Sequence, residues 1–279
     1  MASLPFFAFI LAVFLLPTTV HADRFNTTAQ RWAWMTGTPN ELRLAARRQK
    51  LRITDLELIG RNPITYAAVM VDNSGANAIR WYLYTDLRLN QLLRASRKDS
   101  SRLIELESYF LSTAPGAQQL FSAVGIPNVG PRFSTLWGYS LNYDARQIKP
   151  RLRNGFFKIV DIDTFSIFGR NFYSFLTVEN ARMNKAVSRF LLHTTPEAIM
   201  KKAKQTNSRV IDTERHFDGK YTAVMEVMKK PVKWFWIRGV LASSIDGLAQ
   251  ANMARVYDLE AYEDGPLFKY DVLLIRNEL

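Results

Sequence analysis

A short phrase recurs five times along the 279-residue chain, and it limits the possible folds more than any other feature. Each copy begins with Arg or Lys and ends with two acidic residues that are two positions apart. The copies begin at Arg52, Arg102, Lys158, Arg209 and Arg255, with separations of 50, 56, 51 and 46 residues. A spacing in this range is typical of repeat proteins, in which each unit buries its hydrophobic face against its neighbours.

Each copy belongs to a longer unit that contains a helix and three short strands. β-Branched and aromatic residues dominate the strands, and Asn, Gly, Pro and Asp separate them, a pattern typical of antiparallel hairpins. The first helix is marked by Thr38-Pro39-Asn40-Glu41, a capping box with proline at the first helical position. We therefore predict an α+β fold of five pseudo-repeats, each a helix plus a three-stranded antiparallel sheet. The units span about residues 38–84, 85–139, 140–193, 194–239 and 240–279.

The fifth unit lacks a third strand after Tyr270, and a matching strand stands at the other end of the chain. Trp32-Ala33-Trp34 corresponds to Trp234-Phe235-Trp236 of the fourth unit. We predict that residues 30–37 pair with the fifth unit and close a propeller-like ring. Closure would leave no bare sheet edge, and bare edges are sites of aggregation.

The first 22 residues have the pattern of a secretory signal peptide. An apolar run from Phe6 to Leu16 ends at Pro17, and Ala22 supplies the small residue expected before a cleavage site. The run is shorter than the roughly 20 residues that span a bilayer, which disfavours the alternative of an uncleaved membrane anchor. We predict a secreted, extracellular protein whose repeat domain covers residues 23–279. Asn26 begins an Asn-Thr-Thr sequon and is a candidate glycosylation site.

Cysteine is absent, and only two histidines follow the predicted signal peptide. Thiol catalysis and zinc sites with cysteine ligands are therefore excluded. His193 and His216 stand at the ends of predicted strands, where we expect packing rather than metal binding. The chain also lacks the Gly-x-Ser-x-Gly, His-Glu-x-x-His, glycine-rich phosphate-loop and Ser-x-x-Lys motifs. We expect no catalytic residues, no metal and no cofactor.

The formal net charge is +12, and basic residues gather where each helix ends and the next strand begins. The helix dipole favours cations there, so a solvated structural face is one explanation. The other is a basic rim, formed if pseudo-symmetry brings the clusters to one side of the ring. Such a rim would attract a polyanion such as an acidic glycan or a cell-surface component, and we do not expect nucleic acid. The candidate binding residues are Arg47, Arg48, Arg94, Arg97, Lys98, Arg151, Arg153, Lys201 and Lys202.

Two acidic residues lie on the same face of the first strand in every unit, because strand side chains alternate with period two. Paired carboxylates can serve acid–base chemistry or bind a hard cation such as calcium. A catalytic site is normally single, whereas this feature recurs five times, so we expect a structural clamp between neighbouring units. The pairs are Asp55 and Glu57, Glu105 and Glu107, Asp161 and Asp163, Asp212 and Glu214, and Asp258 and Glu260.

An aromatic residue recurs on the third strand of the predicted units. These residues are Trp34, Trp81, Trp137, Phe190 and Trp236. Because these five residues fall at equivalent positions in the repeat, we expect them to form one layer of the hydrophobic core of the ring. An exposed platform on which sugars stack is the alternative, and it requires a face open to solvent.

The phrase Arg-hydrophobic-x-Asp-Leu-Glu-x-Tyr, followed by Tyr-x-Ala-Val and then Trp, resembles the tandem-repeat domains of bacterial secreted proteins. It is also similar to the repeat-bearing N-terminal domain of fungal polyglycine hydrolases, most closely at Arg102 to Tyr109 and Arg255 to Tyr262. In those hydrolases a separate β-lactamase-like domain carries the Ser-x-x-Lys nucleophile, which this chain lacks. The resemblance implies the repeat fold and a secreted setting, and it transfers no catalytic residue.

Together these features lead us to expect a secreted, non-catalytic binding module that holds an extracellular anionic partner. The alternative is a secreted, peptidase-related hydrolase whose site is lined by the repeat carboxylates. Convergence of carboxylate pairs within metal-binding distance would favour the hydrolase. Pairing of the carboxylates with the repeat Arg or Lys would favour the binding module.

Overall fold

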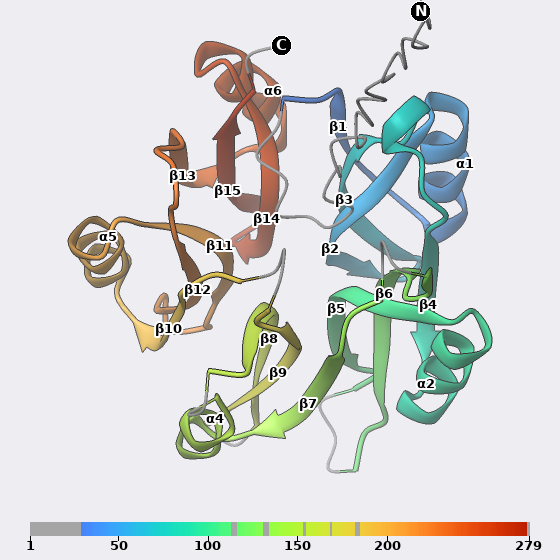
Figure 1. The fold of residues 1–279 in the computed structure, drawn as a ribbon, viewed down its shortest axis with the longest axis horizontal. Helices are drawn as coiled ribbons and strands as arrows, with labels where there is room; N and C mark the ends of the chain where they lie inside the picture. The colour runs from blue at the N-terminus through green and yellow to red at the C-terminus, as the bar shows by residue number, and fades with distance from the viewer. Residues whose placement is uncertain are drawn as a thin grey trace, which may run out of the picture.

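A computed structural model describes residues 29–112, 116–130, 134–152, 155–167, 169–181 and 185–277. The described residues form five three-stranded antiparallel sheets, each with a helix in the same segment of chain. Figure 1 shows the sheets arranged around a common centre, with the helices on the outside and the first sheet beside the fifth. The predicted α+β class with five helix-plus-sheet units is confirmed. The predicted signal peptide and Asn26 lie outside the described residues.

Each unit contains an outer strand, a helix, an inner strand and a middle strand, in that chain order. The first two units consist of β1 (Trp32–Gly37), α1 (Pro39–Gln49), β2 (Leu51–Arg61) and β3 (Ile64–Asp72), then β4 (Tyr82–Leu87), α2 (Leu89–Lys98), β5 (Ser101–Phe110) and β6 (Gln119–Pro127). The third and fourth consist of β7 (Trp137–Tyr143), α4 (Ala145–Leu152), β8 (Phe157–Ile167) and β9 (Arg170–Glu179), then β10 (Ser188–Thr194), α5 (Pro196–Gln205), β11 (Ser208–Arg215) and β12 (Tyr221–Val227). The fifth consists of β13 (Trp234–Val240), α6 (Ala242–Ala251), β14 (Ala254–Asp264) and β15 (Leu267–Arg276).

The helix of each unit is a crossover connection. The outer and inner strands are both antiparallel to the middle strand that separates them, so they run parallel to each other. Parallel strands cannot be joined by a tight turn, and the helix supplies the longer path. The capping box predicted at the start of α1 is present. The Glu41 carboxylate accepts a 2.8 Å hydrogen bond from the Thr38 amide, and the Thr38 hydroxyl accepts one of 3.4 Å from the Glu41 amide.

The predicted partner of the N-terminal strand was wrong. β1 pairs with β3 in the first sheet, with Trp32 opposite Val71 and Gly37 opposite Tyr66. The third strand of the fifth sheet is β13, so that unit is complete without residues 30–37. The match between Trp32 and Trp234 reflects the fact that both begin outer strands. Because each outer strand precedes its helix, the predicted unit boundaries are displaced by one strand.

Every inner strand contains a β-bulge directly before its first repeat carboxylate. The register shifts between Ile53 and Asp55, Leu103 and Glu105, Ile159 and Asp161, Val210 and Asp212, and Val256 and Asp258. A bulge inserts one residue and re-aims the side chains beside it. Ile104, the extra residue of β5, packs in one hydrophobic cluster with Leu56 and Met70 of the first sheet. The bulges therefore help neighbouring sheets to pack face to face.

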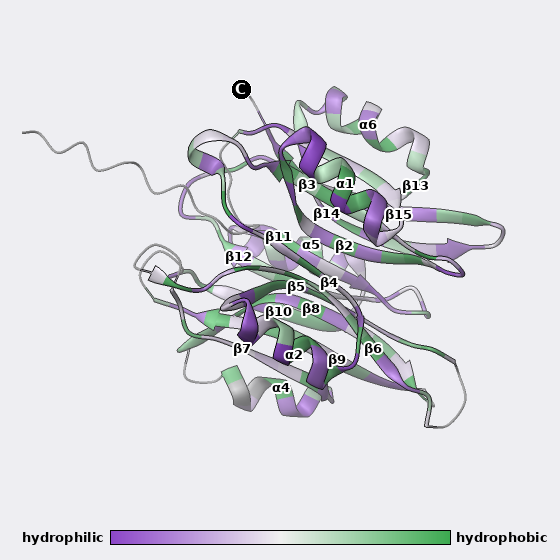
Figure 2. Cartoon of the chain, turned by 90° about the vertical axis from the view of Figure 1, so that its right-hand side faces the viewer, coloured by the Kyte–Doolittle hydropathy of each residue, from purple (hydrophilic) through white to green (hydrophobic). Residues whose placement is uncertain are grey.

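Hydrophobic contacts also join the first and fifth units. Trp32 and Trp34 of β1 pack against the cluster that contains Val256 and Leu274 of the fifth sheet. The Trp34 indole N–H donates a 2.8 Å hydrogen bond to Asp246 of α6. On the outside, α1 buries Leu42 and Ala46 and exposes Arg47 and Arg48. Figure 2 shows hydrophilic and hydrophobic residues along the helices.

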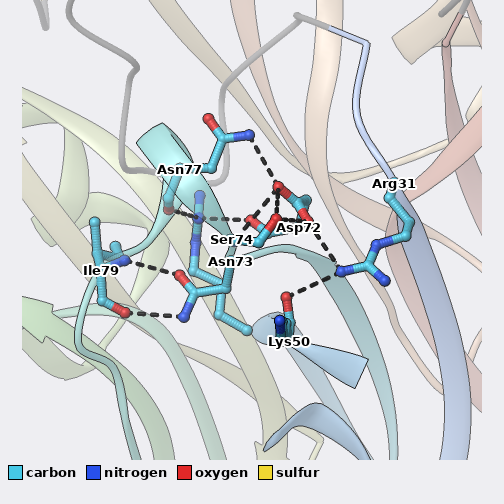
Figure 3. Close-up of polar contacts among 8 residues, drawn as sticks. Arg31, Lys50, Asp72, Asn73, Ser74, Asn77 and Ile79 are labelled. Atoms are coloured by element: carbon cyan, nitrogen blue, oxygen red, sulfur yellow. Dashed lines mark hydrogen bonds and ion pairs between the residues drawn. The ribbon is translucent and has the colours of Figure 1, made fainter. Parts of the chain in front are cut away.

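An asparagine after the middle strand holds the connection to the next unit. The Asn73 side chain accepts from the Ile79 amide at 2.9 Å and donates to its carbonyl at 3.0 Å (Figure 3). Asn128 holds Thr135 in the same way, with distances of 3.0 and 3.1 Å. Asn277, after the last strand, holds Gln30 at 2.8 and 2.9 Å. Gln30, just before β1, thus occupies the place that Ile79 and Thr135 occupy before β4 and β7.

Among the described residues, no helix combines the length and the apolar character that crossing a membrane requires.

Candidate functional site

The inner strands bring the repeat cations into the buried centre of the molecule. These residues are Arg52, Arg102, Lys158, Arg209 and Arg255, and none is more than 7% exposed. Because such cations follow helix ends, the sequence pattern predicted that they belong to the exposed basic clusters. The alternation of the inner strand instead turns them inward. They are not part of a basic rim.

Backbone carbonyls and carboxylates surround the buried cations. The Arg52 guanidinium donates to the carbonyls of Asp72 and Asn77, at 3.2 and 3.3 Å. Asp72 itself is held by Arg31 at 3.1 Å and by Ser74 at 2.8 Å, as Figure 3 shows. Lys158 on β8 of the third unit forms a 2.9 Å ion pair with Glu226 on β12 of the fourth.

The first carboxylate of a pair contacts the inner strand of the preceding unit. Asp161 accepts a 3.0 Å hydrogen bond from the Leu106 amide, and Asp212 accepts a 2.7 Å bond from Ile162. Asp55 accepts a 2.8 Å bond from Leu259, which connects the first unit to the fifth. The five first carboxylates and the five cations each have at least one interaction partner within the fold. The first carboxylates therefore link neighbouring sheets.

The second carboxylates of the pairs approach one another. Glu57, Glu214 and Glu260 each place a carboxylate oxygen within 4.8 Å of the other two. Asp163, from the third unit, accepts a hydrogen bond from the Ser108 hydroxyl. The recurrence of the pairs predicted one structural role for both members. In the structure both members of a pair can bond to the preceding unit, as Asp161 does with Leu106 and Asp163 with Ser108. Three of the second members also converge on one point.

Burial and mutual repulsion raise the pKa of the second carboxylates. Burial is the largest cause in every case, and neighbouring carboxylates add to it. The pKa values of Glu57, Glu107, Glu214 and Glu260 lie well above the ordinary value. Burial raises the pKa of Asp163 to about 7. The centre therefore favours protons or another positive charge.

The predicted basic binding residues lie on the outer helices of different units. Arg47 and Arg48 are exposed on α1, Lys201 is exposed on α5, and Lys202 is half-buried. Arg94, Arg97 and Lys98 are exposed on α2. Arg153 and the side chain of Arg151 lie outside the described part of the chain. The helices are spread around the outside in Figure 1, so these residues do not form a single patch.

One of these basic residues lines a cavity between the second and third units. The cavity has a volume of about 360 Å³ and lies between the end of α2 and the start of β7. Arg97, Trp137 and Tyr139 are on its wall, and the two aromatic rings have centroids 6.4 Å apart at 45°. The remaining lining residues are Leu93, Ser96, Ser100, Ser101, Asn128 and Gly138. Arg97 was predicted as a binding residue and Trp137 as a core residue, and no sequence signal predicted that they meet.

The two histidines lie together in the fourth unit. His216 is 3% exposed and its ring shares a 2.8 Å hydrogen bond with the Thr222 hydroxyl. Burial lowers the pKa of His216 to about 4, so this ring is neutral at ordinary pH. His193 contacts Asp218 at 2.9 Å, and its ring centroid lies 4.9 Å from that of His216. Both positions fit packing roles.

No family model matches the sequence, and no curated protein matches it.

Proposed function

We propose that the chain is a secreted, non-catalytic binding module that holds an acidic glycan in the pocket beside α2. The observation that carries this proposal is the meeting of Arg97 with Trp137 and Tyr139 in one cavity. The apolar face of a sugar ring packs on an aromatic ring, and a carboxylate or sulfate group requires a cation. A concave site that combines aromatic walls with a few polar groups is typical of small-ligand binding.

The charge of the pocket selects an anionic sugar over a neutral one. No acidic residue is among the lining residues in the described part of the chain, and Arg97 is exposed. Tyr139 is 36% exposed, so its ring is open to a ligand. Ser100 adds a hydroxyl at the end of α2, which can donate to or accept from a sugar hydroxyl. The pocket thus offers charge, a stacking surface and a hydrogen-bonding group.

The other exposed basic residues strengthen the attraction without defining the site. Arg47 and Arg48 on α1 and Lys201 on α5 belong to a chain with a net charge of +12. Such charges raise the local concentration of a polyanion and speed its association. They act through solvent, so salt screens them. A long acidic glycan would contact them after one of its sugars enters the pocket.

The proposal includes a closed, propeller-like ring, although its closure differs from the one predicted from sequence. No strand is exchanged between the ends of the chain, because β1 and β13 each complete their own sheet. Closure is supported by the contacts of Asn277 with Gln30 and of Asp55 with Leu259. The likeness of the repeat phrase to tandem-repeat domains of secreted proteins agrees with this arrangement. A closed ring would hold α2 and β7 in a fixed relation.

A hydrolase with a carboxylate-lined site is the second candidate. The convergence of Glu57, Glu214 and Glu260 favours it. Against it, Glu260 is 6% exposed and Asp163 is 4% exposed, so a polymer has little access to the two. The hydrolase predicts that the protein cleaves a peptide or glycan and that Glu214→Gln abolishes the cleavage. The binding module predicts no cleavage and an unchanged affinity for the glycan in Glu214→Gln.

Binding of a sulfated or uronic-acid oligosaccharide, measured by titration calorimetry at increasing salt, tests the proposal. We expect Arg97→Ala to weaken binding by about tenfold or more, which corresponds to about 1.4 kcal/mol. Arg94→Ala is the matched control, because Arg94 is exposed on the same helix and does not line the cavity. Tyr139→Ala should weaken binding of a neutral analogue as well, because it removes stacking rather than charge.

If Arg97→Ala and Arg94→Ala reduce the affinity for the oligosaccharide equally, binding is unspecific attraction to the basic helices. Absence of binding to any acidic oligosaccharide at low salt would contradict the proposal altogether. Binding that does not weaken as salt increases would exclude charge as its main source.

A further inference from the structure

We infer that Glu57, Glu214 and Glu260 bind a calcium ion at the centre of the molecule. The three side chains come from β2, β11 and β14, which belong to the first, fourth and fifth units. Each offers a carboxylate oxygen, and the three oxygens lie within 4.8 Å of one another. Three separate strands thus direct ligands of one chemical kind to one point. This site is independent of the pocket beside α2.

Glu260 supplies an observation beyond the clustering itself. Its side chain is buried, with 6% exposure, and one oxygen, Oε1, accepts a 3.1 Å hydrogen bond from the Arg215 amide. The other oxygen, Oε2, is buried and has no hydrogen-bond partner among the described residues. A buried carboxylate oxygen without a partner is strongly unfavourable, because it has lost water and gained nothing in return. A bound cation would supply the missing partner.

The charges around the three glutamates do not balance. Ten repeat carboxylates stand against five repeat cations, and the cations lie three positions before the first carboxylate of each pair. The charges that act most strongly on Glu57 and Glu214 all come from other carboxylates. Burying several like charges together is unfavourable unless a positive charge accompanies them. The second carboxylates therefore need a charge that the repeat itself does not provide.

The chemistry of the donors selects calcium. The cluster offers oxygen ligands only, since it contains no His and the chain contains no Cys. Carboxylate oxygens suit hard cations, whereas zinc favours nitrogen and sulfur. Oxygens that bind one calcium ion are at most about 5 Å apart, because each Ca–O distance is about 2.3–2.6 Å. Magnesium requires near-ideal octahedral geometry and usually keeps several of its waters, so three carboxylates from separate strands suit calcium better.

An ion in this position would connect the first unit to the last two. Glu57 lies two residues after Asp55 on β2, and Glu260 lies next to Leu259 on β14. The 2.8 Å hydrogen bond between Asp55 and Leu259 and the proposed ion would therefore join the same pair of inner strands. Calcium would stabilise the folded chain by binding it and not the unfolded chain. The expected role of the ion is structural.

Calcium titration of the full mature chain, freed of divalent cations by a chelator, tests the inference. Calorimetry should show saturable binding of one ion per chain, and the melting temperature should rise with calcium. Glu260→Gln should weaken calcium binding by about tenfold or more, because it removes one charged ligand. Glu263→Gln is the matched control, since Glu263 is exposed on the same strand and lies outside the cluster. It should change the affinity by less than about twofold.

Three results would overturn the inference. One is the absence of both binding heat and a melting shift in the wild type. Another is equal calcium affinity in Glu260→Gln and Glu263→Gln, which would place the ion elsewhere. The third is a wild-type melting temperature that does not change with calcium and is lower than that of Glu260→Gln. This result would show that protons alone neutralise the cluster. If Glu260→Gln does not fold, Glu214→Gln provides the same comparison from a half-buried position.

Discussion

The Asp55 carboxylate accepts a 2.8 Å hydrogen bond from the backbone amide of Leu259, a residue 204 positions further along the chain. The same relation connects Asp161 with Leu106 and Asp212 with Ile162. The contact between the first and fifth units is therefore of the same kind as the contacts between consecutive units. Stability should depend on these carboxylates and on the asparagines that hold the connections.

Replacing Asn277 should affect stability as much as replacing Asn73. Each side chain makes two hydrogen bonds to one backbone residue, Gln30 in one case and Ile79 in the other. Loss of a buried or half-buried hydrogen bond usually lowers stability by about 0.5–1.5 kcal/mol. We expect Asn277→Ala and Asn73→Ala to lower the free energy of unfolding by similar amounts in a denaturant titration. A neutral Asn277→Ala beside a destabilised Asn73→Ala would indicate that the contact between Asn277 and Gln30 does not hold the first and fifth units together.

The two carboxylates of one pair should have different effects on stability. Asp212→Ala removes the acceptor of the Ile162 amide and leaves that buried N–H without this bond, which should lower stability by about 1–3 kcal/mol. Glu214→Gln removes one charge from a cluster of carboxylates. In the presence of a chelator it should leave stability unchanged or raise it. Thermal melting of the two variants compares them directly, and an equal loss in both would contradict separate roles.

The stability of the protein should decrease as the pH rises through about 7, because of Asp163. Its pKa is raised from 3.8 to about 7 in the folded state, so the native chain holds a proton that the unfolded chain has released. The stabilisation is complete below the unfolded pKa of 3.8 and has been lost once the pH has risen through the folded pKa of about 7. His216 acts in the opposite direction, but only below its ordinary pKa of 6.5. The informative window therefore lies between pH 6.5 and about pH 8.

Asp163→Asn should make the melting temperature less dependent on pH in this window, because the amide cannot ionise. The measurement requires a chelator, so that no divalent cation replaces the proton. An identical pH dependence in the variant and the wild type would assign the effect to other groups.

Deletion of residues 31–37 should destabilise the first sheet. The deletion removes β1, exposes the edge of β3 and removes the Trp34 contact with Asp246. Hydrogen exchange should accelerate first in β3, because its amides lose their partners there. Acceleration that begins in β15 would instead support pairing with the fifth unit, which the strand order contradicts.

The repeat phrase was sufficient to predict the sheets but not the partner of the first strand. Alternation and turn residues are local properties, so they identified the inner strands around Asp55 and the capping box at Thr38. The likeness of Trp32 to Trp234 showed that two strands are equivalent. That two outer strands are equivalent does not determine which middle strand each of them pairs with. That depends on the order of outer strand, helix and inner strand in the folded unit.

The two sites depend on distances that the sequence does not encode locally. Arg97 and Trp137 are 40 positions apart and meet only because α2 lies against the outer strand of the next unit. Glu57 and Glu260 have the same local pattern as the other second carboxylates. Their convergence follows from the way the inner strands surround a centre. Arg52 was grouped with exposed cations because it follows a helix end, although its strand position turns it inward.

Hydrogen exchange at the Leu259 amide tests most directly whether the first and fifth units are joined through carboxylates. In the wild type this amide should be as protected as that of Ile162, since each donates to an aspartate of the next unit. Asp55→Ala should accelerate exchange at Leu259 more than at Ile162, and Asp212→Ala should do the reverse. If Asp55→Ala leaves Leu259 protected, or accelerates both amides equally, the first and fifth units are not linked by this contact.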